Sequence, residues 1–152
     1  MSNNERASKI YNGICDVLDG NGWRYTKKED QYVIILSVTG QDLEMDLIIK
    51  VDDERELVSI ISPMSFAMSE DKLIEGAIAT CAATYKLADG SFDYDIHTGK
   101  IYFRLTSTYR GCEIGKGLLE YMVDVSLSTI DVYNDKFMAL NKGYINIDSF
   151  FE

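Results

Sequence analysis

Two short alternating segments joined by a turn constrain the fold more than any other part of this chain. Residues 92–105 read Phe-Asp-Tyr-Asp-Ile-His-Thr-Gly-Lys-Ile-Tyr-Phe-Arg-Leu, with apolar and polar residues alternating on both sides of a loop. Because successive side chains of a strand point to opposite faces, this pattern predicts an antiparallel hairpin with one apolar face. Gly99, in the loop 97–100, supplies the left-handed backbone conformation that such a turn requires.

The same segment favours one pairing register. The predicted apolar pairs are Phe92 with Leu105, Tyr94 with Phe103 and Ile96 with Ile101. The predicted polar pairs are Asp93 with Arg104 and Asp95 with Tyr102. A slip by one residue would mix the two faces, so we expect the faces to be strongly specified. The side chain of Asp95 is also suited to capping the turn.

The first half of the chain indicates a helix followed by strands. Helical periodicity predicts a helix that begins near Asn3 or Asn4 and ends at residues 20–22, Gly-Asn-Gly. Its apolar stripe consists of Ile10, Ile14, Val17 and Leu18. Strands are predicted at residues 23–28, 32–38, 43–51 and 57–61. In the third of these, Leu43, Met45, Leu47, Ile49 and Val51 are expected inward and Glu44, Asp46 and Lys50 outward, which is typical of a sheet with one covered face.

The second half continues with helices around the hairpin. Pro63 is expected to open a loop that runs to Met68, and Ser69 is a good N-cap for a second helix that ends at Gly90. The stripe of that helix expected to face the core consists of Leu73, Ala77, Ile78, Cys81, Tyr85 and Ala88. A long helix is predicted at 116–142, and the tail 144–152 is too rich in Ile and Phe to be freely solvated. We therefore predict one α+β domain, residues 1–152, with helices packed on one face of an antiparallel sheet.

Charge restricts the partners that the chain can bind. Its 15 Lys and Arg residues against 25 Asp and Glu residues give a net charge of −10. This balance argues against binding duplex nucleic acid or an anionic membrane, because both need a basic surface. A protein partner with a basic surface is compatible, although an acidic balance also serves solubility alone. The start of the chain lacks the apolar run of a signal peptide, so we expect a cytoplasmic protein.

Residues that usually carry chemistry are sparse. His97 is the only histidine, which argues against imidazole metal sites and His-activated nucleophiles. The segment 111–117, Gly-Cys-Glu-Ile-Gly-Lys-Gly, has three residues where a phosphate loop has four, and it lacks the final Ser or Thr. The acidic run 52–56 lacks the interior Gly of a calcium loop. We therefore expect no catalytic residues, no cofactor, no metal and no enzymatic activity.

The long helix carries more apolar surface than one sheet should need. At 100° per residue, one apolar sector consists of Leu119, Val123, Ile130, Tyr133 and Phe137. The next sector consists of Leu118, Met122, Val125 and Val132. An acidic ridge fills the remaining wedge and consists of Glu120, Asp124, Ser128, Asp131 and Asp135. Two interpretations are open: the second sector packs against the first helix and the tail, or it forms a dimer or partner interface.

Several short segments resemble a known family. They are Thr-Tyr-Lys-Leu at 84–87, Gly-Ser-Phe-Asp at 90–93 and Gly-Lys-Ile-Tyr-Phe-Arg at 99–104, followed by the long helix. Together they resemble the YbjN family, often labelled bacterial sensory transduction regulators, over about residues 23–137. Family members usually have Asn-Tyr where this chain has Thr84-Tyr85, and Gly-Asn-Phe-Glu where it has Gly-Ser-Phe-Asp. The resemblance implies a fold similar to the class I type III secretion chaperones, which are small, acidic, dimeric proteins that bind extended protein segments. It implies no catalytic residues.

These observations lead to one functional hypothesis and one alternative. The hypothesis is a non-enzymatic, cytoplasmic protein-binding module with a chaperone-like or regulatory role, which also forms a homodimer partly through the long helix. The alternative is a small-ligand-binding or enzymatic domain whose site the sequence does not reveal. A deep pocket with converging polar groups would favour the alternative, and an open sheet face or a groove beside a two-fold axis would favour the hypothesis.

Overall fold

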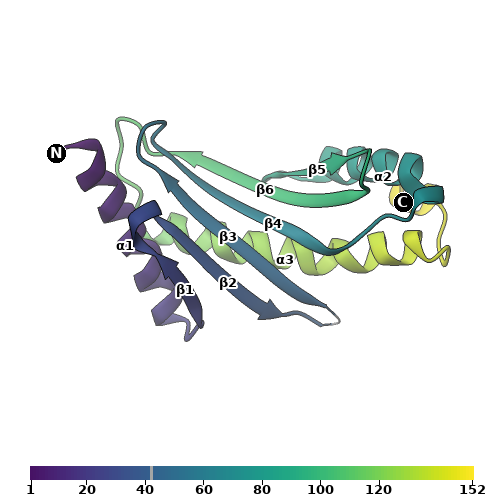
Figure 1. The fold of residues 1–152 in the computed structure, drawn as a ribbon, viewed down its shortest axis with the longest axis horizontal. Helices are drawn as coiled ribbons and strands as arrows, with labels where there is room; N and C mark the ends of the chain where they lie inside the picture. The colour runs from purple at the N-terminus through teal and green to yellow at the C-terminus, as the bar shows by residue number, and fades with distance from the viewer. Residues whose placement is uncertain (42) are drawn as a thin grey trace.

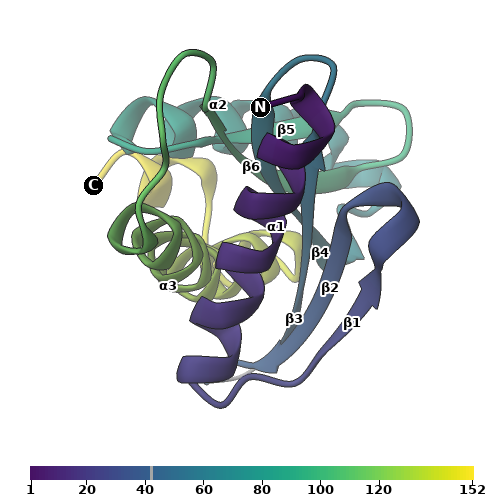
Figure 2. The same ribbon diagram turned by 90° about the vertical axis from the view of Figure 1, so that its left-hand side faces the viewer.

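An antiparallel sheet with helices on one face forms the body of the molecule (Figures 1 and 2). The computed structural model describes residues 1–41 and 43–152. Across these residues the strands, in the order β1-β2-β3-β4-β6-β5 along the sheet, are β1 (Tyr25–Lys28), β2 (Val33–Thr39), β3 (Glu44–Asp52), β4 (Leu57–Ala67), β6 (Lys100–Thr108) and β5 (Ser91–Asp95). The α-helices are α1 (Asn3–Gly20), α2 (Leu73–Lys86) and α3 (Lys116–Asn141). Short 3-10 helices cover Glu29–Gln31, Glu70–Lys72 and Ile147–Phe150. The predicted α+β class is confirmed.

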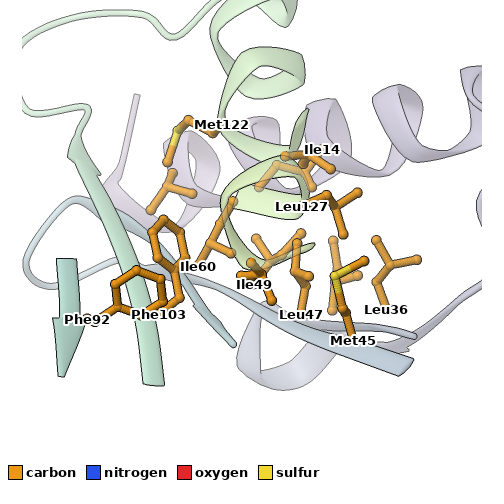
Figure 3. Close-up of a cluster of buried hydrophobic side chains, with 14 of the residues drawn as sticks. Ile14, Leu36, Met45, Leu47, Ile49, Ile60, Phe92, Phe103, Met122 and Leu127 are labelled. Carbon is orange, nitrogen blue, oxygen red and sulfur yellow. The ribbon is translucent and has the colours of Figure 1, made fainter. Parts of the chain in front are cut away.

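The covered face of the sheet is built from alternate residues of each strand. In β3, residues 45, 47, 49 and 51 are buried, whereas Glu44, Asp46 and Lys50 are exposed. Ile49 lies between Ile34 of β2 and Ile60 of β4. Apolar rows therefore run across the strands and meet helix side chains in the core (Figure 3), where burial supplies most of the stabilising free energy.

Two helices cross the covered face together. α1 begins with a capping box, in which the Ser2 side chain accepts from the Glu5 amide and the Glu5 carboxylate accepts from the Ser2 amide. α1 packs against α3 (Figure 2). A Cβ at Gly13 of α1 would lie 3.1 Å from Leu119 Cδ1 of α3. The predicted stripe of α1 is fully buried, so this helix is placed as the sequence indicated.

The C-terminal tail returns to the core. α3 ends before Gly143, whose φ of 75° reverses the chain. Phe150 is 2% exposed, and its ring centroid lies 5.2 Å from that of Phe137. The expectation that the tail is not freely solvated is confirmed, and the tail also packs beside α2 (Figure 1).

The hairpin of β5 and β6 has the predicted faces but a different register. Phe92 pairs with Phe103, Asp93 with Tyr102, Tyr94 with Ile101 and Asp95 with Lys100. The predicted pairs are therefore wrong by two residues, a shift that keeps every side chain on its face. The cause is the turn, which is formed by residues 96–99 and begins one residue earlier than predicted. Asp95 caps it by accepting from the His97 amide, and Ile96, predicted to be apolar-paired, is 46% exposed.

The predicted loop after Pro63 is also wrong, because β4 continues through this proline to Ala67. β4 pairs with β3 only over Leu57–Ile61, while its pairing with β6 extends to Pro63 and, after a bulge, to Ala67. At Pro63 the strand has a neighbour on one side only. A proline is tolerated there because its missing N–H costs no ladder hydrogen bond on the open side.

The second helix is rotated relative to its prediction. Its buried residues are Gly76, Ala79, Thr80, Ala82 and Ala83, whereas Ile78, Cys81 and Tyr85 of the predicted core stripe are exposed. The reason is the close approach of α2 to β5. A Cβ at Gly76 would lie 2.5 Å from the Tyr94 hydroxyl oxygen, and the Phe92 amide donates to Thr84 Oγ1 at 2.9 Å. Only small residues fit between the helix and the strand, so the large apolar side chains point outward.

Candidate interaction surface

The outer side of α3 exposes a stripe of large apolar side chains. Leu118 is 43%, Tyr121 50% and Val132 59% exposed, and Val125 is half-buried. At 100° per residue these four lie within about 60° of one another, and we call them the α3 stripe. They include three of the four residues predicted as a dimer or partner surface. The fourth, Met122, is 3% exposed and lies among the core side chains (Figure 3), so its assignment to that surface is corrected.

Met122 is buried because the elements packed around α3 cover a wide sector of that helix. The buried sector of the helix spans about 140°, from Met122 and Leu140 at one limit to Leu127 at the other. α1, the sheet and the tail together cover this sector. Leu118 and Val132 lie just beyond it. The second apolar sector is therefore divided: Met122 is buried within the chain, whereas Leu118 and Val132 are exposed.

An acidic ridge runs beside the α3 stripe. Glu120, Asp124 and Asp131 occupy the sector that follows the stripe around the helix. Asp131 makes a hydrogen bond within the chain, since its Oδ1 accepts from the Gln41 amide at 3.0 Å. Asp124 and Ser128 are exposed. The outer side of α3 thus presents apolar side chains with negative charge along one border.

Tyr121 ties the stripe to the end of α2. Its hydroxyl donates to Asp89 Oδ2, in the connection between α2 and β5. This hydrogen bond raises the pKa of Tyr121, because the phenol holds its proton more tightly beside the carboxylate. The bond fixes the direction of an aromatic ring that would otherwise rotate freely at the surface.

α2 exposes a second stripe of apolar side chains, three of which, Ile78, Cys81 and Tyr85, were predicted to face the core. Ile74 is 65%, Ile78 42% and Tyr85 90% exposed, and Cys81 lies between them on the same side. We call these four residues the α2 stripe. The signal that could have revealed them is the opposite side of the helix, which consists almost entirely of Gly, Ala and Thr.

A cleft lies between α1 and the connection from β6 to α3. It has a volume of about 800 Å³, and its walls include Ile10, Ile114 and Leu119. This volume is within the range of small-molecule sites. Several of the charged side chains that line it are paired with other protein groups, however. Lys9 pairs with Glu113 at 3.1 Å, and Arg6 pairs with Glu56.

Glu56 pairs with Arg6, one of the residues that line that cleft. The side chain of Glu56 is 12% exposed and accepts from Arg6 and, at 3.2 Å, from Arg110 Nε. Arg6 also donates to the Tyr109 carbonyl at 2.6 Å and lies 5.5 Å from the centre of its ring. These contacts join α1, the β3–β4 turn and the end of β6. The arginines are used in holding the fold together rather than in presenting free charge to a ligand.

The other segments considered for chemistry occupy peripheral positions. His97 lies exposed in the β5–β6 turn, and a Cβ added at Gly111 or Gly117 would meet nothing within 4 Å. Over residues 1–41 and 43–152, no group of three or more His, Cys, Asp or Glu side chains is arranged to hold a metal ion. Among the helices of the same residues, none is long and apolar enough to cross a membrane.

Comparison with known proteins identifies a solved structure with a similar fold. No protein family model matches the chain, and neither does any curated protein. Among solved structures, the crystal structure of YbjN from E. coli, described there as "a putative transcription regulator", superposes with a TM-score of 0.65. The match covers 90% of this chain and 94% of that one, with 10% of residues identical. The likeness therefore concerns the fold, and it agrees with what the sequence segments implied: this chain has a YbjN-like fold.

Proposed function

We propose that this chain is a non-enzymatic protein-binding module, with a chaperone-like or regulatory role, that contacts its partner through the α3 stripe. The observation that carries the proposal is the exposure of Leu118, Tyr121 and Val132 along one side of a helix whose other side is fully packed. Exposed apolar stripes of this kind mark interaction sites more often than they mark stable free surfaces.

The chemistry of the partner follows from what borders the stripe. Apolar side chains of the partner would cover Leu118 and Val132, while Lys or Arg side chains would face Glu120 and Asp124. Such complementarity speeds encounter and selects the partner. An amphipathic helix or an extended segment with a basic flank would satisfy both requirements.

A regulatory role for this module does not require contact with DNA. The net charge is −10, and proteins that bind duplex DNA rely on Lys and Arg to neutralise phosphates. We therefore expect regulation through a protein partner. A mobility-shift titration with duplex DNA at low salt should show no complex, and a tight, sequence-dependent complex would contradict this.

The test of the proposal is capture of a partner by the tagged full chain from the source organism, followed by mass spectrometry. Leu118→Asp and Val132→Asp should each abolish capture of the same protein. Ile96→Asp is the matched control, because Ile96 is a similarly exposed apolar residue in the β5–β6 turn. Equal capture by all variants would show that the α3 stripe is not the contact surface.

The cleft beside α1 supports a second candidate, a small-ligand site, on the ground of its volume. The pairing of Arg6, Lys9 and Glu113 with other protein groups argues against this candidate. Calorimetry with ATP and with divalent ions should show no binding in the micromolar range. Micromolar or tighter binding would favour the ligand-binding alternative over the protein-binding module.

A further inference from the structure

We propose that an extended segment of a partner protein adds a strand to the sheet along the start of β3, between β3 and β4. The segment carries Lys or Arg at alternate positions, with apolar or hydroxyl side chains between them. This site lies within the sheet, whereas the α3 stripe lies on the outer side of a helix. The inference therefore does not depend on the proposed function.

The first observation is that the ladder between β3 and β4 stops partway along both strands. It joins Ile48–Asp52 of β3 to Leu57–Ile61 of β4. In the part of the chain that the structure describes, residues 44–47 of β3 therefore have β2 as their only neighbouring strand, and β4 beyond Ile61 pairs with β6 alone. We call residues 44–47 the open edge of β3.

The open edge presents backbone hydrogen-bonding groups. Along an antiparallel strand, successive residues bond to opposite neighbours. The Val51 amide and the Leu43 carbonyl both bond toward β2, at 3.0 Å and 2.9 Å, so the odd-numbered residues of β3 face that strand. Glu44 and Asp46 therefore direct their amide and carbonyl groups to the other side, where no strand of the described residues is paired with them.

Pro63 is the reason that β4 does not cover these groups. Ile48 lies opposite Ile61, so a continued ladder would place Asp46 opposite Pro63. Proline has no amide to donate to the Asp46 carbonyl. The bulge between Pro63 and Ala67 then bends β4, and the two strands diverge (Figure 1).

α3 holds the diverging strands apart. Asp131 accepts from the Gln41 amide beside the start of β3, and Asn141 donates to the Ala67 carbonyl at the end of β4. The two α3 residues are ten positions apart, which corresponds to about 15 Å along a helix. Neighbouring strands lie about 4.8 Å apart. The ends of β3 and β4 are therefore held too far apart to pair, and the separation leaves room for one further strand.

Two buried polar atoms in this part of the fold lack a partner. Ser62 is 1% and Asn134 2% exposed, and neither Ser62 Oγ nor Asn134 Oδ1 forms a hydrogen bond with a described residue. Ser62 is the first residue of β4 beyond the ladder, and Asn134 lies on α3 between Asp131 and Asn141. A buried polar atom without a partner costs free energy. An inward-facing Thr or Ser of the added strand would supply a partner for Ser62.

The side chains along the open edge define the segment that fits it. Glu44 and Asp46 are exposed on the outer face of the sheet, so the outward side chains of the added strand should be Lys or Arg. Met45 and Leu47 are buried on the covered face, so the inward side chains should be apolar, apart from the one beside Ser62. Alternation of this kind belongs to an extended segment and not to a helix.

The test uses the full chain and the labelled peptide Lys-Val-Lys-Thr-Lys-Val-Lys, with Glu-Val-Glu-Thr-Glu-Val-Glu as the charge-reversed control. Fluorescence anisotropy should give a Kd below about 1 mM for the first peptide and no binding of the second. NMR should show that the first peptide slows hydrogen exchange of the Glu44 and Asp46 amides. Absence of binding, or binding without protection of these two amides, would overturn the proposal.

A pair of proline substitutions tests the backbone contact. Asp46→Pro removes an amide on the open edge and no hydrogen bond to β2, so the circular dichroism spectrum should be unchanged. Binding of the Lys peptide should weaken about tenfold or more. Thr39→Pro is the matched control: the Gly40 amide bonds toward β3, so the Thr39 amide faces the other side of β2, beyond the end of β1. The control should bind like wild type, and equal weakening in both variants would contradict the site.

A charge exchange tests the same site without a proline. Glu44→Lys combined with Asp46→Lys changes two exposed side chains and keeps both amides. This double variant should bind the Glu peptide in preference to the Lys peptide. Retention of the wild-type preference would show that the open edge of β3 is not where the peptide lies.

The two proposals fail in different ways. Val132→Asp, on the α3 stripe, should leave the Kd of the Lys peptide unchanged. Capture of a partner that depends on the α3 stripe, without peptide binding, overturns only the added strand. Peptide binding with the expected amide protection, without capture of a partner, overturns only the proposed function.

Discussion

Phe92 lies directly opposite Phe103 in the β5–β6 hairpin, and their rings meet edge to face with centroids 5.5 Å apart. Phe92 makes similar edge contacts with Tyr133 and Phe137 of α3. The hairpin is thereby attached to the long helix through aromatic rings, which contribute both buried area and a preferred geometry. The same strand contacts α2 through the hydrogen bond from the Phe92 amide, so β5 positions both exposed helices.

Truncation of the core aromatic should therefore cost far more than truncation of its neighbour on the outer face. Phe103 is 0% exposed, and Phe103→Ala should lower the free energy of unfolding by about 3–5 kcal/mol. Arg104 pairs with Asp93 at 2.6 Å, but its side chain is 56% exposed, and Arg104→Ala should cost under about 1 kcal/mol. Urea unfolding measures both. Equal costs would mean that the two faces of the hairpin are misassigned.

The hairpin shows what can and cannot be predicted from the alternation of apolar and polar residues. Alternation assigned residues 92–105 to their faces, because a face depends only on the parity of each position. Parity does not distinguish two registers that differ by two residues. The predicted register used Ile96 as a paired apolar residue, whereas the Asp95 cap draws Ile96 into an exposed turn. Turn geometry, and not hydrophobicity, decided the register.

The two exposed stripes show a second limit. On α2, periodicity correctly found an apolar side but could not say that it faces outward, because the inward side is chosen by the space beside β5. On α3, Leu118 and Met122 share one sector of the helical projection, yet one is 43% and the other 3% exposed. The limit of the covered sector depends on how α1 and the tail pack against α3. The sequence of α3 alone does not determine that packing.

Removal of the Glu56 carboxylate charge should weaken the junction of α1, β4 and β6. In Glu56→Gln the guanidinium groups of Arg6 and Arg110 lose their charged acceptor. Because Glu56 is largely buried, the expected loss in the free energy of unfolding is about 2–3 kcal/mol, somewhat below that for breaking a fully buried pair. The control is Glu113→Gln, which breaks the exposed pair with Lys9 and should cost under about 1 kcal/mol. A loss no larger than that of the control would show that Glu56 contributes no more than a surface charge.

The capping box of α1 should make stability fall at low pH. Hydrogen bonds from the Ser2 amide and hydroxyl lower the pKa of Glu5 below its ordinary value of 4.5. A lowered carboxyl pKa contributes stability above the unfolded-state pKa, and this contribution is lost as pH falls through the folded-state pKa. Glu5→Gln keeps an acceptor for the cap but does not titrate. The difference in unfolding free energy between wild type and Glu5→Gln should be constant near neutral pH and shift against wild type below about pH 4.5. A difference in unfolding free energy between the two proteins that does not change with pH would show that titration of Glu5 in the capping box does not affect stability.

Two glycines with similar backbone angles but different surroundings give a matched test of how α2 is held. Gly99 and Gly111 have φ values of 73° and 68°, so alanine is strained by about 1–2 kcal/mol at either position. A Cβ at Gly111 would meet nothing within 4 Å, whereas a Cβ at Gly99 would lie 2.4 Å from the Met68 carbonyl oxygen. Met68 donates its amide to the Gly99 carbonyl at 2.8 Å, which attaches the β5–β6 turn to the segment that leads into α2.

Gly99→Ala should therefore cost clearly more than Gly111→Ala in urea unfolding, since only the former must push backbone apart. The displaced segment precedes α2 and sets where that helix begins. Equal unfolding free energies for the two variants would show that the contact between Met68 and the turn does not restrain α2.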